Sequence, residues 1–136
     1  MDARRPSPTR TQADELAKKV FSYEKDHYAV KKQYVGADTH VLGQLVDVNV
    51  PAGTDLLYAE TDESNPFVSE EQMMPFVPFL RTADFDLAVD LAIKYEHGFG
   101  HTAVIHSSNL DHITQMGRAV NTTLFVVNGP STACLG

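Results

Sequence analysis

Apolar side chains recur at helical spacing in the segment that starts at Thr11. They fall three or four positions apart with charged residues between them, which is the pattern of an amphipathic helix that buries one face. Residues 1–10 lack this periodicity and are rich in proline and arginine, so they are expected to form a flexible N-terminal tail. The stripe of the expected helix consists of Ala13, Leu16, Ala17, Val20 and Phe21.

The next segments give weaker signals. Residues 22–36 fit neither a helix nor a strand clearly, and they end at Gly36. A short helix is expected over residues 37–45. A turn is expected at residues 51–53, because Pro51 fixes one backbone angle and Gly53 permits a positive φ.

From residue 56 onward, short apolar runs alternate with helix-like segments. Pro78 interrupts the second of these runs, and because proline lacks a backbone donor it favours an edge position or a bulge. Strands separated by helices are joined by crossovers, so the sequence predicts an α/β fold with a mainly parallel sheet and flanking helices. The expected strands cover residues 56–59, 76–80, 102–106 and 123–127, and the expected helices cover residues 84–96 and the segment after Ser108.

Both of these helices have a predicted inner face. Gly98 is expected to end the first, and Ser108 with Asp111 resembles a capping box that begins the second. The inner face of the first consists of Phe85, Ala88, Val89, Ala92 and Ile93. The inner face of the second consists of Leu110, Ile113, Met116 and Val120.

The composition indicates one globular domain with an acidic body. The chain has 136 residues, of which 43% are hydrophobic, enough for one core but not for two full domains. Its net charge of −7 makes nucleic acid a poor partner, because phosphate backbones would be repelled. Residues 1–36 carry a surplus of basic side chains, which is typical of a solvated helical face.

Location is predicted from what the sequence does not contain. The single cysteine, Cys134, excludes an internal disulfide and suits a reducing compartment. The basic start is not followed by an apolar run, so no secretory signal is expected, and no stretch is long and apolar enough to span a membrane. These observations predict a cytoplasmic protein.

Three local motifs are interpreted as structural. Gly98, Gly100 and Ala103 match a dinucleotide fingerprint, but they follow a helix and enter a strand, the reverse of the order that phosphate binding requires. His97 and His101 are four residues apart, yet glycines interrupt the helix that would pair them, so no metal site is expected. Cys134 has no visible base or electropositive surroundings, so it is interpreted as an ordinary thiol.

Several runs together resemble the CoA-acylating aldehyde dehydrogenases, the branch related to the aldehyde half of aldehyde-alcohol dehydrogenases and to microcompartment propionaldehyde and acetaldehyde dehydrogenases. They follow the family order and extend over nearly everything after residue 10. The strongest matches are NPFVSEEQMMP (65–75), EHG (96–98), HTAVIHS (101–107), NLD (109–111) and FVVNGPS (125–131), with weaker ones over 12–21, 34–36 and 50–54.

The resemblance implies a chemistry and also what this chain lacks. In the family, a cysteine thiolate attacks the aldehyde, NAD takes the hydride and CoA takes the acyl group from the enzyme thioester. The nucleophilic cysteine and the nucleotide-binding domain precede the matched region. Residues 11–136 are therefore expected to be a partial catalytic domain with no catalytic residue of its own, inactive when alone.

The resemblance also implies ligand contacts. Glu71 matches the glutamate of the family's Glu-x-Phe motif, whose carboxylate accepts hydrogen bonds from the nicotinamide ribose hydroxyls. Met73 stands where many relatives have phenylalanine, and Asn65 replaces an expected histidine. The expected substrate-lining residues follow the last strand and are Asn128, Gly129, Pro130 and Ser131.

Partners and rival functions follow from the same resemblance. An aldehyde and CoA are the expected small molecules, and a homo-oligomer or a microcompartment shell is an expected protein partner. One rival is an inactive assembly module that docks through the stripe between Ala13 and Phe21, although most such stripes pack within their own chain. The other rival is a small regulator that binds nucleotide without turnover.

Overall fold

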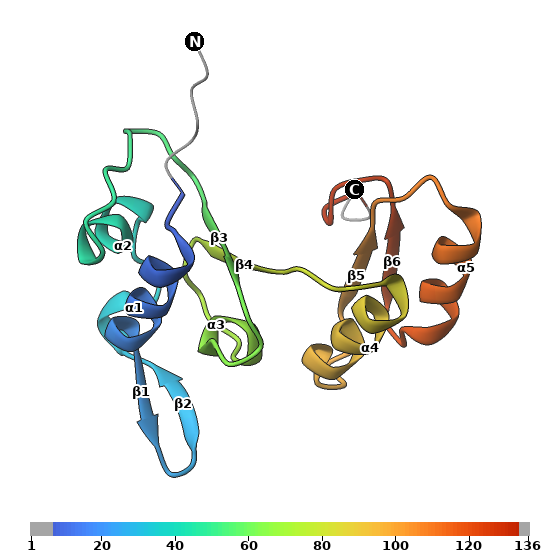
Figure 1. Cartoon of the computed structure of the whole chain (residues 1–136), viewed down its shortest axis with the longest axis horizontal. Helices are drawn as coiled ribbons and strands as arrows, with labels where there is room; N and C mark the ends of the chain where they lie inside the picture. The colour runs from blue at the N-terminus through green and yellow to red at the C-terminus, as the bar shows by residue number, and fades with distance from the viewer. Residues whose placement is uncertain (1–6, 134–136) are drawn as a thin grey trace. The chain divides into compact units, whose positions relative to one another are not determined.

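The computed structural model describes residues 7–133, which divide into two compact units at Arg81 and Thr82 (Figure 1). Cys134 lies outside the described residues. The first unit contains α1 (Arg10–Val20), β1 (Phe21–Glu24), β2 (His27–Val30), η1 (Lys32–Tyr34), α2 (Thr39–Leu45), β3 (Leu57–Thr61), α3 (Pro66–Ser69) and β4 (Phe76–Leu80). The second unit contains α4 (Phe85–Glu96), β5 (Thr102–Ile105), α5 (Leu110–Ala119) and β6 (Leu124–Val127).

Helix α1 forms as the apolar spacing predicts, and it begins one residue earlier. Thr9 caps it, since the Thr9 hydroxyl accepts a hydrogen bond from the backbone N–H of Gln12 and the Thr9 N–H donates one to the Gln12 side-chain oxygen. The whole predicted stripe is buried in the core of the first unit, at 0–4% exposure. It therefore offers no free surface, which contradicts the docking role of the assembly alternative.

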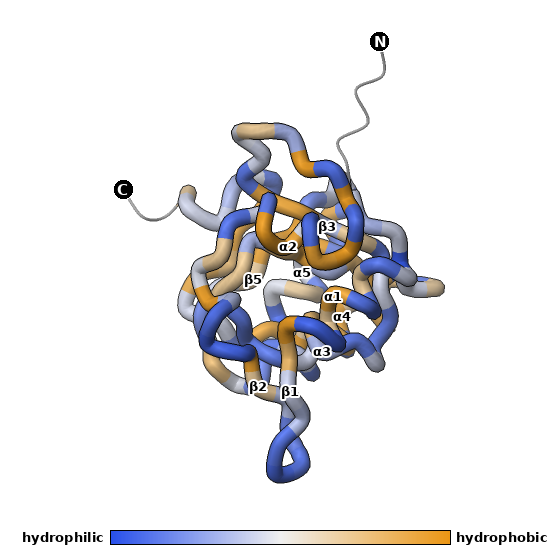
Figure 2. Tube along the Cα trace, turned by 90° about the vertical axis from the view of Figure 1, so that its left-hand side faces the viewer, coloured by the Kyte–Doolittle hydropathy of each residue, from blue (hydrophilic) through white to orange (hydrophobic). Residues whose placement is uncertain are grey.

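The segment that gave no clear pattern is a hairpin. Strands β1 and β2 pair antiparallel, with Phe21 opposite Val30. The two residues of the turn, Lys25 and Asp26, both have positive φ, as a two-residue turn between twisted strands requires. Asparagine or aspartate followed by glycine usually marks such a turn, so a lysine followed by an aspartate hides it from sequence analysis. Figure 2 shows that the tip is hydrophilic.

Strands β3 and β4 form a parallel pair joined through α3. Alternate β3 residues Leu57, Ala59 and Thr61 are buried, so one face of the strand covers the core. Pro78 lies opposite Ala59 in a two-stranded sheet, where β4 keeps the edge that its proline predicts. Strand β3 extends to Thr61, two residues beyond the prediction.

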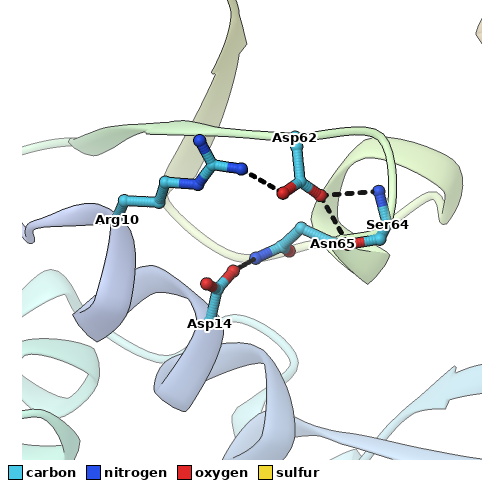
Figure 3. A network of polar contacts seen from close by, with 5 residues as sticks. All are labelled: Arg10, Asp14, Asp62, Ser64 and Asn65. Atoms are coloured by element: carbon cyan, nitrogen blue, oxygen red, sulfur yellow. Dashed lines mark hydrogen bonds and ion pairs between the residues drawn. The ribbon is translucent and has the colours of Figure 1, made fainter.

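A polar network ties α1 to the loop between β3 and α3 (Figure 3). Asp62 pairs with Arg10 and accepts hydrogen bonds from the hydroxyl and the backbone N–H of Ser64. The Ser64 hydroxyl and N–H, followed by Arg10, hold the pKa of Asp62 below its usual range. Asn65 donates to Asp14 across 2.8 Å, which links the same loop to the helix a second time.

The second unit has a parallel pair, β5 and β6, and two helices. Asp84 caps α4, and His97 in the left-handed region ends it, one residue before the predicted Gly98. Val89, Ile105 and Val126 are the buried apolar residues described in this unit. The described sheets are three separate two-stranded pairs, two parallel and one antiparallel, so the α/β prediction is confirmed.

Three details of this unit differ from the prediction. Asn109, not Ser108, caps α5, because the Asn109 side chain accepts from the backbone N–H groups of Asp111 and His112. Leu110 is 76% exposed and Ile93 is 44% exposed, so neither belongs to an inner face. Periodicity places a residue on a helix face, but it does not show whether a neighbour covers that end of the face. Within residues 7–133, no helix is long and apolar enough to cross a membrane.

The Asp62 network predicts a pH-dependent stability. Because the folded state lowers the pKa of Asp62, the stabilisation is complete above the unfolded-state pKa of about 4 and is lost as the pH falls through the folded value. We expect Asp62→Asn to be less stable than the wild type near neutral pH and equally stable at about pH 2, measured by urea denaturation. Asp55→Asn, which changes an exposed aspartate, is the matched control. An equal difference at both pH values would contradict the role of Asp62.

Candidate functional site

The first candidate site is the exposed segment between α3 and β4. Glu71 is exposed, and its carboxylate makes no hydrogen bond or ion pair with a described residue. Met73, two positions later, is 74% exposed, which is unusual for a large apolar side chain. The segment thus presents an available acceptor and an apolar surface close together in sequence, a combination suited to a ribose and its ring.

The backbone of this segment is held at several points. Gly36 donates to the Met73 carbonyl at 2.8 Å, and Leu57 donates to the Pro75 carbonyl at 2.9 Å. The Gln72 side chain accepts from the Met74 N–H and donates to the Phe76 carbonyl. Glu71 and Met73 therefore extend from an anchored backbone, although their own side chains are exposed.

A hollow borders the same segment. It has a volume of about 730 Å³, and its wall includes Gly36 and Pro75, next to the Met73 backbone. The side chains of Asp38, His40 and Asp55 also line it. A volume of this order is within the range of small-molecule sites.

The second candidate site is the loop that follows β6. Asn128 has a φ of 53°, and its N–H continues the sheet by donating to the Ile105 carbonyl at 2.8 Å. Its side chain pairs with one residue through both polar groups: Oδ1 accepts from the Ser107 N–H and Nδ2 donates to the Ser107 carbonyl, each at 2.9 Å. This Asn128–Ser107 clasp joins the ends of β5 and β6, a structural role that the sequence did not predict.

Exposure varies along the rest of the loop. Gly129 is half-buried, while Pro130 and Ser131 are exposed. The Pro130 carbonyl accepts from the N–H of Ala133, which closes a turn. The loop lies at the carboxyl ends of parallel strands, where α/β proteins usually bind ligands. Pro130 and Ser131 are the exposed members of the predicted substrate loop whose side chains do not take part in the clasp.

The other sequence candidates have structural roles. Asn65 is 3% exposed and caps α3, since its Oδ1 accepts from the Phe67 N–H at 3.0 Å. Gly98 and Gly100 lie between α4 and β5, both with positive φ, which confirms the reason for rejecting the dinucleotide fingerprint. The carboxylate of Glu96 accepts from both glycine N–H groups and fixes this turn.

Metal ligands do not cluster in the part of the chain that the structure describes. No group of three or more histidine, cysteine or acidic residues is placed to hold an ion within residues 7–133.

The pKa of Glu60 is lowered by an ion pair and not by a ligand site. Arg81 donates to both carboxylate oxygens of Glu60, at 3.2 and 2.9 Å, and thereby lowers that pKa. This exposed pair connects β3 to the end of β4 and contributes little to stability.

Sequence analysis missed Gln72 and Ser107. Gln72 occupies the unspecified middle position of the Glu-x-Phe motif, between the two predicted cofactor residues, and its side chain bonds the backbone. Ser107 contributes only backbone groups to the clasp. A polar residue flanked by two exposed ligand candidates in an extended segment is a usable signal, because alternate side chains point to opposite sides. Ser107 offers no such signal, because any non-proline residue has the same backbone groups.

The clasp predicts a local loss of stability when Asn128 is replaced. Asn128→Gly keeps the positive φ accessible and removes both side-chain hydrogen bonds, so we expect the free energy of unfolding to fall by about 1–2 kcal/mol in urea titrations. Asn128→Asp retains the acceptor for the Ser107 N–H and should lose less. Asn121→Gly, at an exposed asparagine without a hydrogen bond from its side chain, controls for the added glycine. Equal losses in the two glycine variants would show that the clasp stabilises nothing.

The chain is similar to known enzymes over nearly its whole length. No family model matches it. The acetylating acetaldehyde dehydrogenase of Salmonella typhimurium is 38% identical over 130 residues, which cover 94% of this chain and 28% of that relative. The chain therefore spans less than a third of the length of that relative.

Solved structures agree with the sequence comparison. A propionaldehyde dehydrogenase from the fucose utilisation microcompartment of Clostridium phytofermentans matches with a TM-score of 0.81 and 32% identity, over 98% of this chain and 30% of that one. The propionaldehyde dehydrogenase of Rhodopseudomonas palustris, solved with bound propionyl-CoA, matches with a TM-score of 0.80 and 32% identity, over 96% and 29% of the two chains. The chain thus matches the CoA-acylating aldehyde dehydrogenases in sequence and in fold, and it corresponds to a fragment of somewhat under a third of their length.

Proposed function

We propose that the chain forms part of the catalytic domain of an enzyme that oxidises a short-chain aldehyde to its acyl-CoA with NAD. The observation that carries this proposal is the pairing of Glu71 and Met73 on one exposed, anchored segment. Both side chains are accessible, and both stand at the positions where the family motif implies contact with the cofactor.

Glu71 acts by accepting hydrogen bonds. An ionised carboxylate has two oxygens and can receive both hydroxyl groups of a ribose, and such charge-assisted bonds are stronger than neutral ones. No described residue competes for this carboxylate. Met73 covers the apolar side of the same sugar, because a flexible thioether adapts to irregular surfaces.

The loop after β6 lines the aldehyde site in this proposal. The Asn128–Ser107 clasp fixes the loop, and the exposed Pro130 and Ser131 contact the substrate. A loop held by its own hydrogen bonds loses little conformational freedom when a ligand binds. Asn128 and Gly129 act chiefly by shaping this loop.

Residues 7–133 include no cysteine, so the thiolate that forms the thioester comes from outside them. We assign it to a segment that precedes the matched region in the family, and not to Cys134. When bound, NAD supplies the hydride acceptor. An engineered glycolyl-CoA reductase with a TM-score of 0.80 to this chain was solved with NADP+, which supports a nicotinamide nucleotide.

The same proposal gives the chain a cellular setting. The Clostridium phytofermentans neighbour belongs to a bacterial microcompartment. By this relationship, we place the enzyme in the cytoplasm, inside such a compartment. There it would contact the shell or other copies of itself.

The proposal predicts a cofactor effect at Glu71. A chimera of the Salmonella typhimurium relative, in which this chain replaces the matched segment, should form NADH from acetaldehyde, CoA and NAD. In it, Glu71→Gln should raise the KM for NAD about tenfold and change kcat by less than about threefold, because a charged acceptor becomes neutral. Glu15→Gln, at an exposed glutamate of α1, is the matched control.

Two results would contradict the proposal. An unchanged KM for NAD in the Glu71→Gln chimera would remove the cofactor contact. Sustained NADH formation by the 136-residue chain itself, abolished by Cys134→Ala, would show that the nucleophile lies in this chain. We expect the isolated chain to show no turnover.

A further inference from the structure

Gln72 separates the two predicted cofactor residues and is less exposed than either of them. Glu71 and Met73 on either side are exposed, whereas Gln72 is half-buried. The backbone conformation that exposes Glu71 and Met73 is therefore the one in which Gln72 is partly buried.

The carboxamide of Gln72 makes two hydrogen bonds to the backbone. Its Oε1 accepts from the Met74 N–H at 2.8 Å, and its Nε2 donates to the Phe76 carbonyl at 3.0 Å. Met74 is 8% exposed and Phe76 is 1% exposed. The side chain therefore connects an exposed segment to residues that the core already fixes.

Backbone hydrogen bonds also hold this stretch, at the Met73, Met74 and Pro75 carbonyls, but none of them involves the Met74 N–H. The Glu70 N–H ends α3 by donating to the Pro66 carbonyl, and the Met73 carbonyl accepts from Gly36. Pro75 has no N–H to donate. Without Gln72, the Met74 N–H loses the partner that the structure gives it, and the stretch around Glu71 keeps only the hydrogen bonds of its carbonyls.

We propose that Gln72 is a positioning residue, whose carboxamide clamps the backbone at Met74 and Phe76 and thereby holds Glu71 and Met73 outward for a nicotinamide nucleotide. This inference rests on the proposed function, since Glu71 and Met73 are its cofactor contacts. Gln72 itself touches no ligand. It lowers the conformational entropy that binding would otherwise remove from the segment.

The test compares three variants of the full chain. Gln72→Met has similar length and lacks both hydrogen bonds, and Gln72→Glu keeps an acceptor for Met74 but loses the donor to Phe76. Gln44→Met removes an exposed carboxamide of α2 that bonds His40, so it is the matched control. Each variant is titrated with NADH, and binding is followed by the fluorescence of NADH. The chain has no tryptophan whose emission would overlap with this signal.

Backbone amide exchange is measured on the same samples without nucleotide. We expect the Met74 amide to exchange at least about tenfold faster in Gln72→Met, less so in Gln72→Glu, and unchanged in the control. The Leu57 amide, which bonds Pro75 in the sheet, should stay protected in all variants and shows that the fold is intact. The NADH titrations are made well below the melting temperature of each variant. There, the Kd for NADH should rise about tenfold in Gln72→Met, whereas a merely structural role of Gln72 would leave the Kd unchanged.

The outcomes separate this inference from the proposed function. If Gln72→Met leaves the exchange of the Met74 amide unchanged, the role of Gln72 is overturned. The same holds if Gln72→Met leaves the NADH affinity unchanged while Glu71→Gln weakens it. In both cases the proposed function stands. Absence of NADH binding by the wild-type chain counts against Glu71 as a cofactor contact of this chain, and the exchange rates then decide whether the clamp exists. Faster exchange with weaker binding supports both.

Discussion

The packing of two phenylalanine rings determines where the Glu71 segment begins and ends. Phe67 of α3 and Phe76 of β4 lie with ring centroids 4.3 Å apart, and each is at most 3% exposed. Phe67 also contacts Phe21, just beyond α1, at 5.0 Å. Both ends of the connecting stretch are buried in one core, and Met74 packs into it as well, so Glu71 and Met73 are the residues of this short stretch that are exposed. Their exposure is thus a consequence of hydrophobic burial at either side.

Carboxamide side chains complete the structure where apolar packing does not reach. Asn65 and Asn109 cap helices, Gln72 spans an irregular segment, and Asn128 joins two strand ends. A carboxamide carries both a donor and an acceptor, so one side chain can satisfy backbone groups that no helix or sheet pairs. This matters most in the second unit, where the buried apolar residues described are few and the clasp holds the loop predicted to contact substrate.

The two candidate sites therefore share a construction. Each has exposed side chains on a backbone that a side-chain amide helps to anchor. Each forms one wall of a ligand site, and the chain spans less than a third of its relatives. The chain's contribution to the reaction in the proposed enzyme is positional: it offers an acceptor, an apolar contact and a shaped loop.

The sequence by itself determined the α/β class, the helix with its stripe from Ala13 to Phe21, and most strand positions, because periodic burial dictates local structure. The resemblance of its motifs determined the family. Only the tertiary structure showed that β1 and β2 form a hairpin, that Leu110 is exposed, and that the amides of Gln72 and Asn128 bond backbone groups. A turn without glycine, the cover over a helix face and the partner of a side chain all depend on segments brought together by folding, and spacing along one chain does not encode those distances.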